Sequence, residues 1–177
     1  MAKRTSGRQR KSLWSQSGPT PRLLFGAFAI AAVGLLGLTP KTLFGLSIAW
    51  PYAALWGAVG WGRVGLSLRP MLLLIVFGLI QDISFNAPFG CFVIVNLVVY
   101  GFSAWIASIF DVMNEPLVAV IAPVLQFISG FVVLWLLASA LEEHAVRATP
   151  LLAALLTTGV IYAMCHKLFD LGRAPGQ

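Results

Sequence analysis

Residues 71–100 read MLLLIVFGLIQDISFNAPFGCFVIVNLVVY, which is two long apolar runs joined by a short turn. Runs of this length and hydrophobicity are what a lipid bilayer selects for. One carboxylate, Asp82, and one carboxamide, Asn96, lie inside them. A charge within a membrane helix costs at least about 2.5–3.5 kcal/mol. We therefore expect Asp82 to face protein or water and to have a hydrogen-bonding partner.

The rest of the chain has the same apolar character. Of its 177 residues, 59% are hydrophobic and 10% are charged, and the mean hydropathy is +0.88. Soluble domains carry about 25% charged residues. The composition therefore indicates an integral membrane protein, and the short connectors leave no room for a soluble catalytic or binding domain.

Six apolar segments predict an all-α membrane protein, a bundle of six transmembrane helices within residues 22–170. The segments are residues 23–38, 46–61, 71–85, 91–109, 116–141 and 151–169. The second is shorter than the roughly 20 residues of a full span. We expect it to thin the bilayer, or to pack as a shorter helix with Trp50, Trp56 and Trp61 near the interfaces. Pro116 is expected to be the first residue of its helix.

The basic residues predict the orientation of this bundle. Residues 1–21 are basic and poor in aliphatic side chains, so we expect a disordered cytoplasmic tail that rests on anionic lipid headgroups rather than on nucleic acid. Residues 171–177 form a second short tail. With both termini in the cytoplasm, ten of the twelve Lys and Arg residues lie inside, and only Lys41 and Arg147 lie outside.

The polar residues of the hairpin, residues 71–100, lie at comparable depth in the outer half of the bilayer. Two arrangements are open for Asp82 and Asn96. They could hydrogen-bond to each other if both face inward. Alternatively, each finds a different partner, such as water, a backbone carbonyl or the side chain of Gln81, Gln126 or Ser129.

The turn of the hairpin contains residues that stop helices. Asn86 tolerates the left-handed conformation that ends a helix. Pro88 cannot continue the incoming helix, and Gly90 permits a tight bend or the close approach of a neighbouring chain. These residues alone describe an ordinary helical hairpin, and they leave unexplained why a carboxylate is kept at position 82.

Catalytic chemistry is not indicated. Asp82 is the only carboxylate at membrane depth, whereas an intramembrane aspartyl protease needs two. His144, His166 and Lys167 lie at the interfaces, too far from a membrane serine to activate it. Neither histidine has a cysteine or a second histidine at ligand spacing, so we predict no metal site and no cofactor. Cys91 lies far in depth from the only other cysteine, so no disulfide is expected.

The string GLIQDISFNAPFG, followed by an apolar run, resembles the rod shape-determining protein MreD family. That family carries a glycine, an aspartate four residues later, a glycine-containing turn and a glycine that opens the next helix. The matching positions are Gly78, Asp82 and Gly90, with Pro88 two residues before the last. The family's turn usually holds further glycines, and here Asn86 can supply the same backbone conformation.

The resemblance implies a non-enzymatic component of the bacterial cell-elongation machinery in the inner membrane. Members of the family support cell shape and lateral peptidoglycan synthesis. They bind the periplasmic scaffold MreC and, through the complex, the actin-like MreB, the glycosyltransferase RodA and an elongation transpeptidase. In that role Asp82 would either fix the packing of the bundle or hold a partner's transmembrane helix.

Two other classes of function remain open. Such sequences also look like the substrate-binding components of energy-coupling-factor vitamin transporters. Those proteins contact their coupling protein through alanines at spacing four in the first helix, and Ala27 and Ala31 fit that spacing. The remaining class is an unrelated channel or carrier with Asp82 in its pathway.

Overall fold

The computed structural model describes residues 18–37, 42–43, 46–47, 49–110, 116–141 and 148–171. Within these residues the regular secondary structure is helical apart from one small two-stranded ladder. The helices are α2 (Pro19–Gly37), α3 (Ala53–Gly62), α4 (Leu68–Ser84), α5 (Cys91–Phe110), α6 (Pro116–Leu141) and α7 (Ala148–Phe169). The strands β1 (Thr42–Leu43) and β2 (Leu46–Ser47) pair antiparallel.

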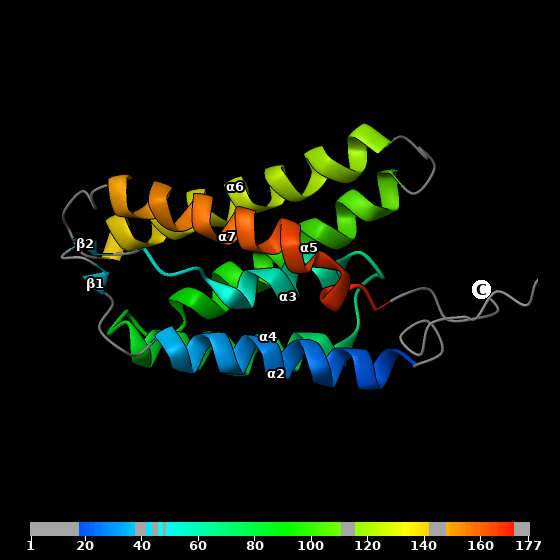
Figure 1. Ribbon diagram of the computed structural model, residues 1–177, viewed down its shortest axis with the longest axis horizontal. Coiled ribbons are helices and arrows are strands. Elements are labelled where there is room, and N and C mark those ends of the chain that lie inside the picture. The colour runs from blue at the N-terminus through cyan, green and yellow to red at the C-terminus, as the bar shows by residue number, and fades with distance from the viewer. Residues whose placement is uncertain are drawn as a thin grey trace, which may run out of the picture.

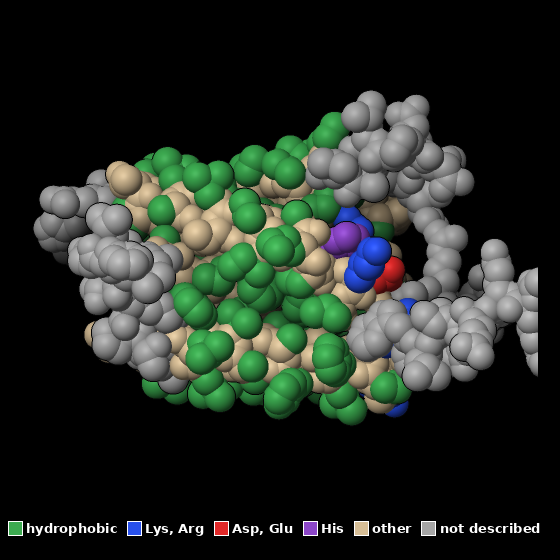
Figure 2. Space-filling view, in the orientation of Figure 1, with side chains coloured by type: hydrophobic (Ala, Val, Ile, Leu, Met, Phe, Trp, Pro, Cys, Tyr) green, Lys and Arg blue, Asp and Glu red, His purple; other side chains and the backbone are tan. Residues whose placement is uncertain are grey.

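Four of these helices are long and apolar enough to cross a membrane: α2, α5, α6 and α7. Figure 2 shows that hydrophobic side chains cover much of the visible face of the helices, as expected for a surface that contacts lipid. The expectation of a multi-pass α-helical membrane protein is therefore confirmed at this coarse level. The predicted connectors at 111–115 and 142–147, Lys41 and most of both tails lie outside the described residues.

Consecutive helices run in opposite directions along the long axis of the molecule (Figure 1). Five of them form a closed ring, because α2 contacts α4, α4 contacts α5, α5 contacts α6, α6 contacts α7 and α7 contacts α2. The short helix α3 contacts all five and lies at the centre of the bundle (Figure 1). Every residue of α3 is buried.

The composition of α3, AALWGAVGWG, suits its central position. A helix enclosed by five others needs small residues on all sides so that the neighbouring backbones can approach. A Cβ at Gly62 would lie 2.5 Å from Cβ of Ser103 and 2.9 Å from the carbonyl oxygen of Tyr100, both on α5. A Cβ at Gly60 would likewise clash with Phe169 of α7.

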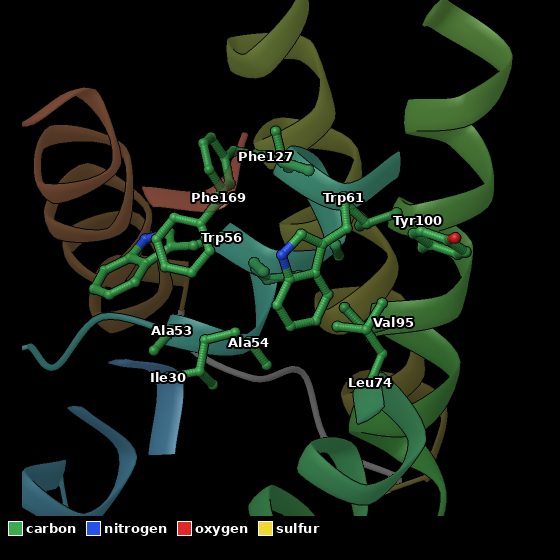
Figure 3. Packing of buried hydrophobic residues seen from close by; sticks show 14 of the residues in the cluster. Ile30, Ala53, Ala54, Trp56, Trp61, Leu74, Val95, Tyr100, Phe127 and Phe169 are labelled. Atoms are coloured by element: carbon green, nitrogen blue, oxygen red, sulfur yellow. The ribbon is translucent and has the colours of Figure 1, made fainter. Parts of the chain in front are cut away.

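The large side chains of α3 fill the core around it. Trp56 packs against Phe169 of α7, with ring centroids 5.9 Å apart, and Ile30 of α2 lies beneath the first turn of α3 (Figure 3). Trp56 and Trp61 are 2% and 0% exposed. Both indoles are therefore enclosed by the surrounding helices rather than exposed on the outer surface of the bundle. The expectation that they lie near the membrane interfaces stays a prediction, because burial among helices does not fix depth in the bilayer.

The observed boundaries correct three expectations. Helix α2 begins at Pro19, so the expected disordered tail of residues 1–21 overlaps its first turn. Leu171, expected in the C-terminal tail, is buried against the core. The second segment becomes helical only from Ala53, because a residue before a proline, here Trp50 before Pro51, is disfavoured in the helical conformation. Helix α6 begins at Pro116, as expected.

Candidate functional site

The candidate site is the hairpin formed by α4, the turn at 85–90 and α5. Helix α4 presents one face to its neighbours, with buried residues at spacing four or close to it: Pro70, Leu74, Gly78 and Asp82. Such spacing places side chains in one row along a helix. The predicted motif residues Gly78 and Asp82 thus lie one turn apart on the same buried face.

Gly78 lets the two helices of the hairpin touch. A Cβ added at position 78 would lie 2.7 Å from both the nitrogen and the Cα of Val93 on α5. These are backbone atoms, which cannot move aside as a flexible side chain could. The close approach therefore requires glycine at this position.

Helix α4 ends in a Schellman motif, the hydrogen-bonded turn that closes many helices. The Ala87 N–H donates to the carbonyl oxygen of Asp82 at 2.9 Å, and the Asn86 N–H donates to that of Ile83 at 3.4 Å. Asn86 has a φ of 51°, which is the left-handed conformation that the sequence predicts for it. The turn closes with Asn86 rather than glycine in the left-handed position.

Asp82 also caps the start of the next helix. Its Oδ2 accepts a hydrogen bond from the Gly90 N–H at 2.8 Å, and its Oδ1 accepts one from the Phe92 N–H at 2.8 Å. Gly90 immediately precedes α5 and Phe92 is its second residue, and N–H groups at the start of a helix lack partners within the helix. The positive end of the helix dipole further stabilises the carboxylate. A side chain on one helix thereby closes the N-terminus of the next.

The remaining turn residues shape the cap. Gly90 has a φ of 92°, a left-handed conformation that costs glycine little. Pro88 is exposed, and its carbonyl oxygen accepts a hydrogen bond from the Cys91 N–H at 3.1 Å. Together these residues turn the chain so that the amides of residues 90 and 92 face the carboxylate of Asp82.

Asn96 takes partners of its own. Its Nδ2 donates to Oε1 of Gln81 at 3.3 Å and to the carbonyl oxygen of Leu74 at 3.4 Å. Asp82 and Asn96 therefore follow the second of the two predicted arrangements, in which each finds a different partner. All six motif residues lie in one hairpin. Asp82 hydrogen-bonds across the turn, and Asn96 hydrogen-bonds from α5 to α4.

Asp82 is 1% exposed, and both of its oxygens are engaged. Because the carboxylate is buried, a partner's helix could contact it only if the hairpin opened. Of the two roles expected for Asp82, the geometry favours fixing the bundle.

Two polar residues outside the motif also hold the bundle, and sequence reasoning missed both. The hydroxyl of Tyr100 accepts from the Ser67 N–H at 2.8 Å and lies 3.1 Å from the carbonyl oxygen of Gly65. Thr158 of α7 accepts from the Tyr52 N–H at 3.1 Å through its Oγ1, and its carbonyl accepts from Trp56 Nε1 at 3.0 Å. A lone Thr or Tyr in an apolar helix gives no sequence signal for such long-range bonds.

A cavity of about 630 Å³ adjoins the hairpin, between α2, the segment before α3 and the C-terminal half of α4. Its walls are mainly apolar, and Gln81 and Ser84 are the polar side chains of α4 among them. The Trp50 indole on the opposite wall is held by a bond to the carbonyl oxygen of Val33 at 3.0 Å. A space of this size is in the range of small-molecule sites in proteins.

Within the part of the chain that the structure describes, no three His, Cys, Asp or Glu side chains lie close enough together to hold a metal ion. Gln126, considered as a partner for the hairpin, lies buried on α6, where its Oε1 has no hydrogen-bond partner among the described residues.

No protein-family model, curated protein or solved structure matches this chain.

Proposed function

We propose that this protein is a non-enzymatic, multi-pass component of the bacterial cell-elongation machinery in the inner membrane. It would support cell shape and lateral peptidoglycan synthesis by binding an MreC-like scaffold protein. Through that complex it would act with an MreB-like actin homologue, a RodA-like glycosyltransferase and an elongation transpeptidase. The proposal rests on the residues that resemble the MreD family and on the geometry that those residues adopt.

The observation that carries the proposal is the joint action of the motif residues. Gly78 permits helix contact, Asp82 caps α5, and Asn86 and Gly90 provide the left-handed turn. A glycine and an aspartate at this spacing could arise by chance in an apolar sequence. Their convergence on one interlocked hairpin favours a motif with a structural purpose.

The proposed topology has six membrane segments and both termini in the cytoplasm. Its support is the alternating course of the helices and the distribution of charge. Apart from Asp82, the charged side chains that the structure describes lie at the end of the bundle where α2 begins and α7 ends: Arg22, Arg63, Arg69, Lys167 and Asp170. The excess of Arg and Lys there favours the cytoplasmic side.

In this proposal α3 is a half-length segment rather than a full span. Its ten residues rise about 15 Å, half of the roughly 30 Å hydrocarbon core. The irregular chain of residues 49–52 that precedes it is half-buried to buried, and irregular backbone is tolerated in a membrane protein where it is covered by protein.

The second candidate function is substrate binding in an energy-coupling-factor-type vitamin transporter. The cavity beside the hairpin favours it, because its volume of about 630 Å³ suits a small ligand. The alanine pair of the first helix weighs against it. Ala27 is buried in the core and Ala31 lines the cavity, so the pair does not form an open face for a coupling protein.

Affinity purification from the native host in mild detergent, with mass spectrometry of the bound proteins, tests the proposal. Recovery of an MreC-like protein with wall-synthesis enzymes is the expected result. Recovery of paired ATPases with a transmembrane coupling protein would refute it and establish the transporter. An unrelated membrane protein of equal abundance, tagged in the same way, controls for hydrophobic carry-over.

A further inference from the structure

A second cavity, of about 250 Å³, lies at the opposite end of the bundle from the hairpin turn. The first residues of α2 and of α4 and the connector between α3 and α4 form its walls. Its lining includes the polar residues Thr20, Ser67 and Arg69 and the apolar residues Leu23, Trp61 and Leu171.

The N-termini of two helices border this cavity. Neither α2 nor α4 has an acidic residue in its first turn, and Ser67 precedes α4 without forming a side-chain cap. The positive ends of helix dipoles attract anions. Pro19, Pro21 and Pro70 carry no N–H, so most donors for an anion here must come from side chains. Arg69 bridges the two helices, since its Nη1 donates to Oγ1 of Thr20 at 3.3 Å.

The charge around the cavity is positive. The described residues at this end carry four cationic side chains, Arg22, Arg63, Arg69 and Lys167, and one anionic side chain, Asp170. Figure 2 shows blue side chains gathered at this end of the molecule. A site of this charge favours an anionic group over a neutral or a zwitterionic one.

The site is held in shape before any ligand binds. The hydroxyl of Tyr100 fixes the connector between α3 and α4 through the Ser67 N–H at 2.8 Å and the Gly65 carbonyl oxygen at 3.1 Å. A preformed site loses less conformational freedom when it is filled.

We propose that this cavity binds the phosphate headgroup of an anionic membrane phospholipid, with Arg69 as its principal contact. The neighbouring surface identifies a lipid rather than free phosphate. Leu24, Leu66 and Leu68 are 60%, 72% and 66% exposed, so apolar surface for acyl chains borders the charged cavity. Basic pockets between transmembrane helices bind anionic headgroups in this way.

The test uses the purified full-length chain in neutral detergent, and native mass spectrometry counts the lipid molecules retained. We expect dioleoylphosphatidylglycerol to be retained in preference to dioleoylphosphatidylcholine. Arg69→Gln should weaken retention of phosphatidylglycerol about tenfold, as expected for the loss of a charge-assisted hydrogen bond. Arg63→Gln is the matched control, because it removes an equal charge from an exposed side chain outside the cavity.

Three results would overturn the proposal. Equal loss of lipid in the Arg69→Gln and Arg63→Gln variants would mean attraction by net charge alone. Displacement of the lipid by millimolar inorganic phosphate would mean a site for the free anion. Equal retention of the two lipids by the unaltered chain would mean no headgroup site. If Arg69→Gln lowers the melting temperature of the protein, Thr20→Val is tested in its place, because it removes a hydroxyl but no charge. Unchanged retention of phosphatidylglycerol by Thr20→Val would then refute the site.

Discussion

Replacement of Asp82 by alanine tests the architecture of the hairpin most severely. The carboxylate accepts hydrogen bonds at 2.8 Å from the N–H groups of Gly90 and Phe92 at the start of α5, and it is 1% exposed. In Asp82→Ala the N–H groups of Gly90 and Phe92 lose their partner, the first in a half-buried turn and the second in the buried start of α5. A buried donor left without a partner costs about 1–3 kcal/mol. The expected loss of stability is therefore about 1–3 kcal/mol from the Phe92 N–H, with a smaller contribution from the Gly90 N–H, which water can reach.

Asp82→Asn separates charge from shape. The carboxamide can accept only one of the two bonds through its oxygen, and its NH₂ group then faces the other amide. We expect a stability between those of the wild type and the alanine variant, or close to that of the alanine variant. Ser84→Ala is the control on the same helix, because Ser84 is exposed and its hydroxyl bonds only to the Ile80 carbonyl oxygen of its own helix.

The assay is equilibrium unfolding of the purified protein in mixed micelles, with hydrogen exchange of residues 85–95 as a local readout. Loss of the cap should speed exchange in the first turn of α5 before it affects α7. If Asp82→Ala unfolds at the same denaturant concentration as Ser84→Ala, the carboxylate does not hold the hairpin and the reasoning fails.

Three further substitutions follow from the same contacts. Gly78→Ala forces a Cβ against the backbone of Val93 and should lower stability by about 1–3 kcal/mol in the same unfolding assay; an unchanged midpoint would mean that the helices do not touch. Asn86→Ala should lose about 1–2 kcal/mol because alanine is strained at a φ of 51°, whereas Asn86→Gly should unfold like the wild type, and equal midpoints for the two variants would contradict the turn. Tyr100→Phe removes the partner of the Ser67 N–H and should lower stability by about 0.5–1.5 kcal/mol while speeding hydrogen exchange at that amide, which unaltered exchange would disprove.

The segments that could be predicted from the sequence are those whose boundaries carry a chemical signal. Pro116 begins α6 as expected, because its missing N–H is no loss in a first turn. Asn86 ends α4 in the left-handed conformation for which few residue types are suited. These signals are local, so a single sequence is enough to interpret them.

The position of α3 could not be inferred in this way. Hydropathy is the same for a helix enclosed by protein and for one that faces lipid, so it predicts a short helix here but not the neighbours of that helix. The run of Ala and Gly in AALWGAVGWG was the available signal. Small residues on every face are typical of a helix surrounded by other helices, whereas a helix that faces lipid usually carries large apolar side chains.

The partner of Asp82 was missed for a different reason. The need for a partner was clear from the cost of a buried charge, but the candidates considered were side chains, water and carbonyl groups. The actual partners are the backbone N–H groups of residues 90 and 92. They are brought within reach only by the combined geometry of the Schellman turn and the left-handed Gly90, which no single residue encodes.

Depletion of this protein in its native host is the measurement that tests the proposed function most directly. Cell width and the incorporation of a fluorescent peptidoglycan precursor along the side wall are followed as the protein disappears. A role in cell elongation predicts that cells widen and round while incorporation along the side wall is lost, and that Ser84→Ala but not Asp82→Ala restores both. Cells that keep their shape and side-wall synthesis, and lose vitamin uptake instead, would contradict the proposal.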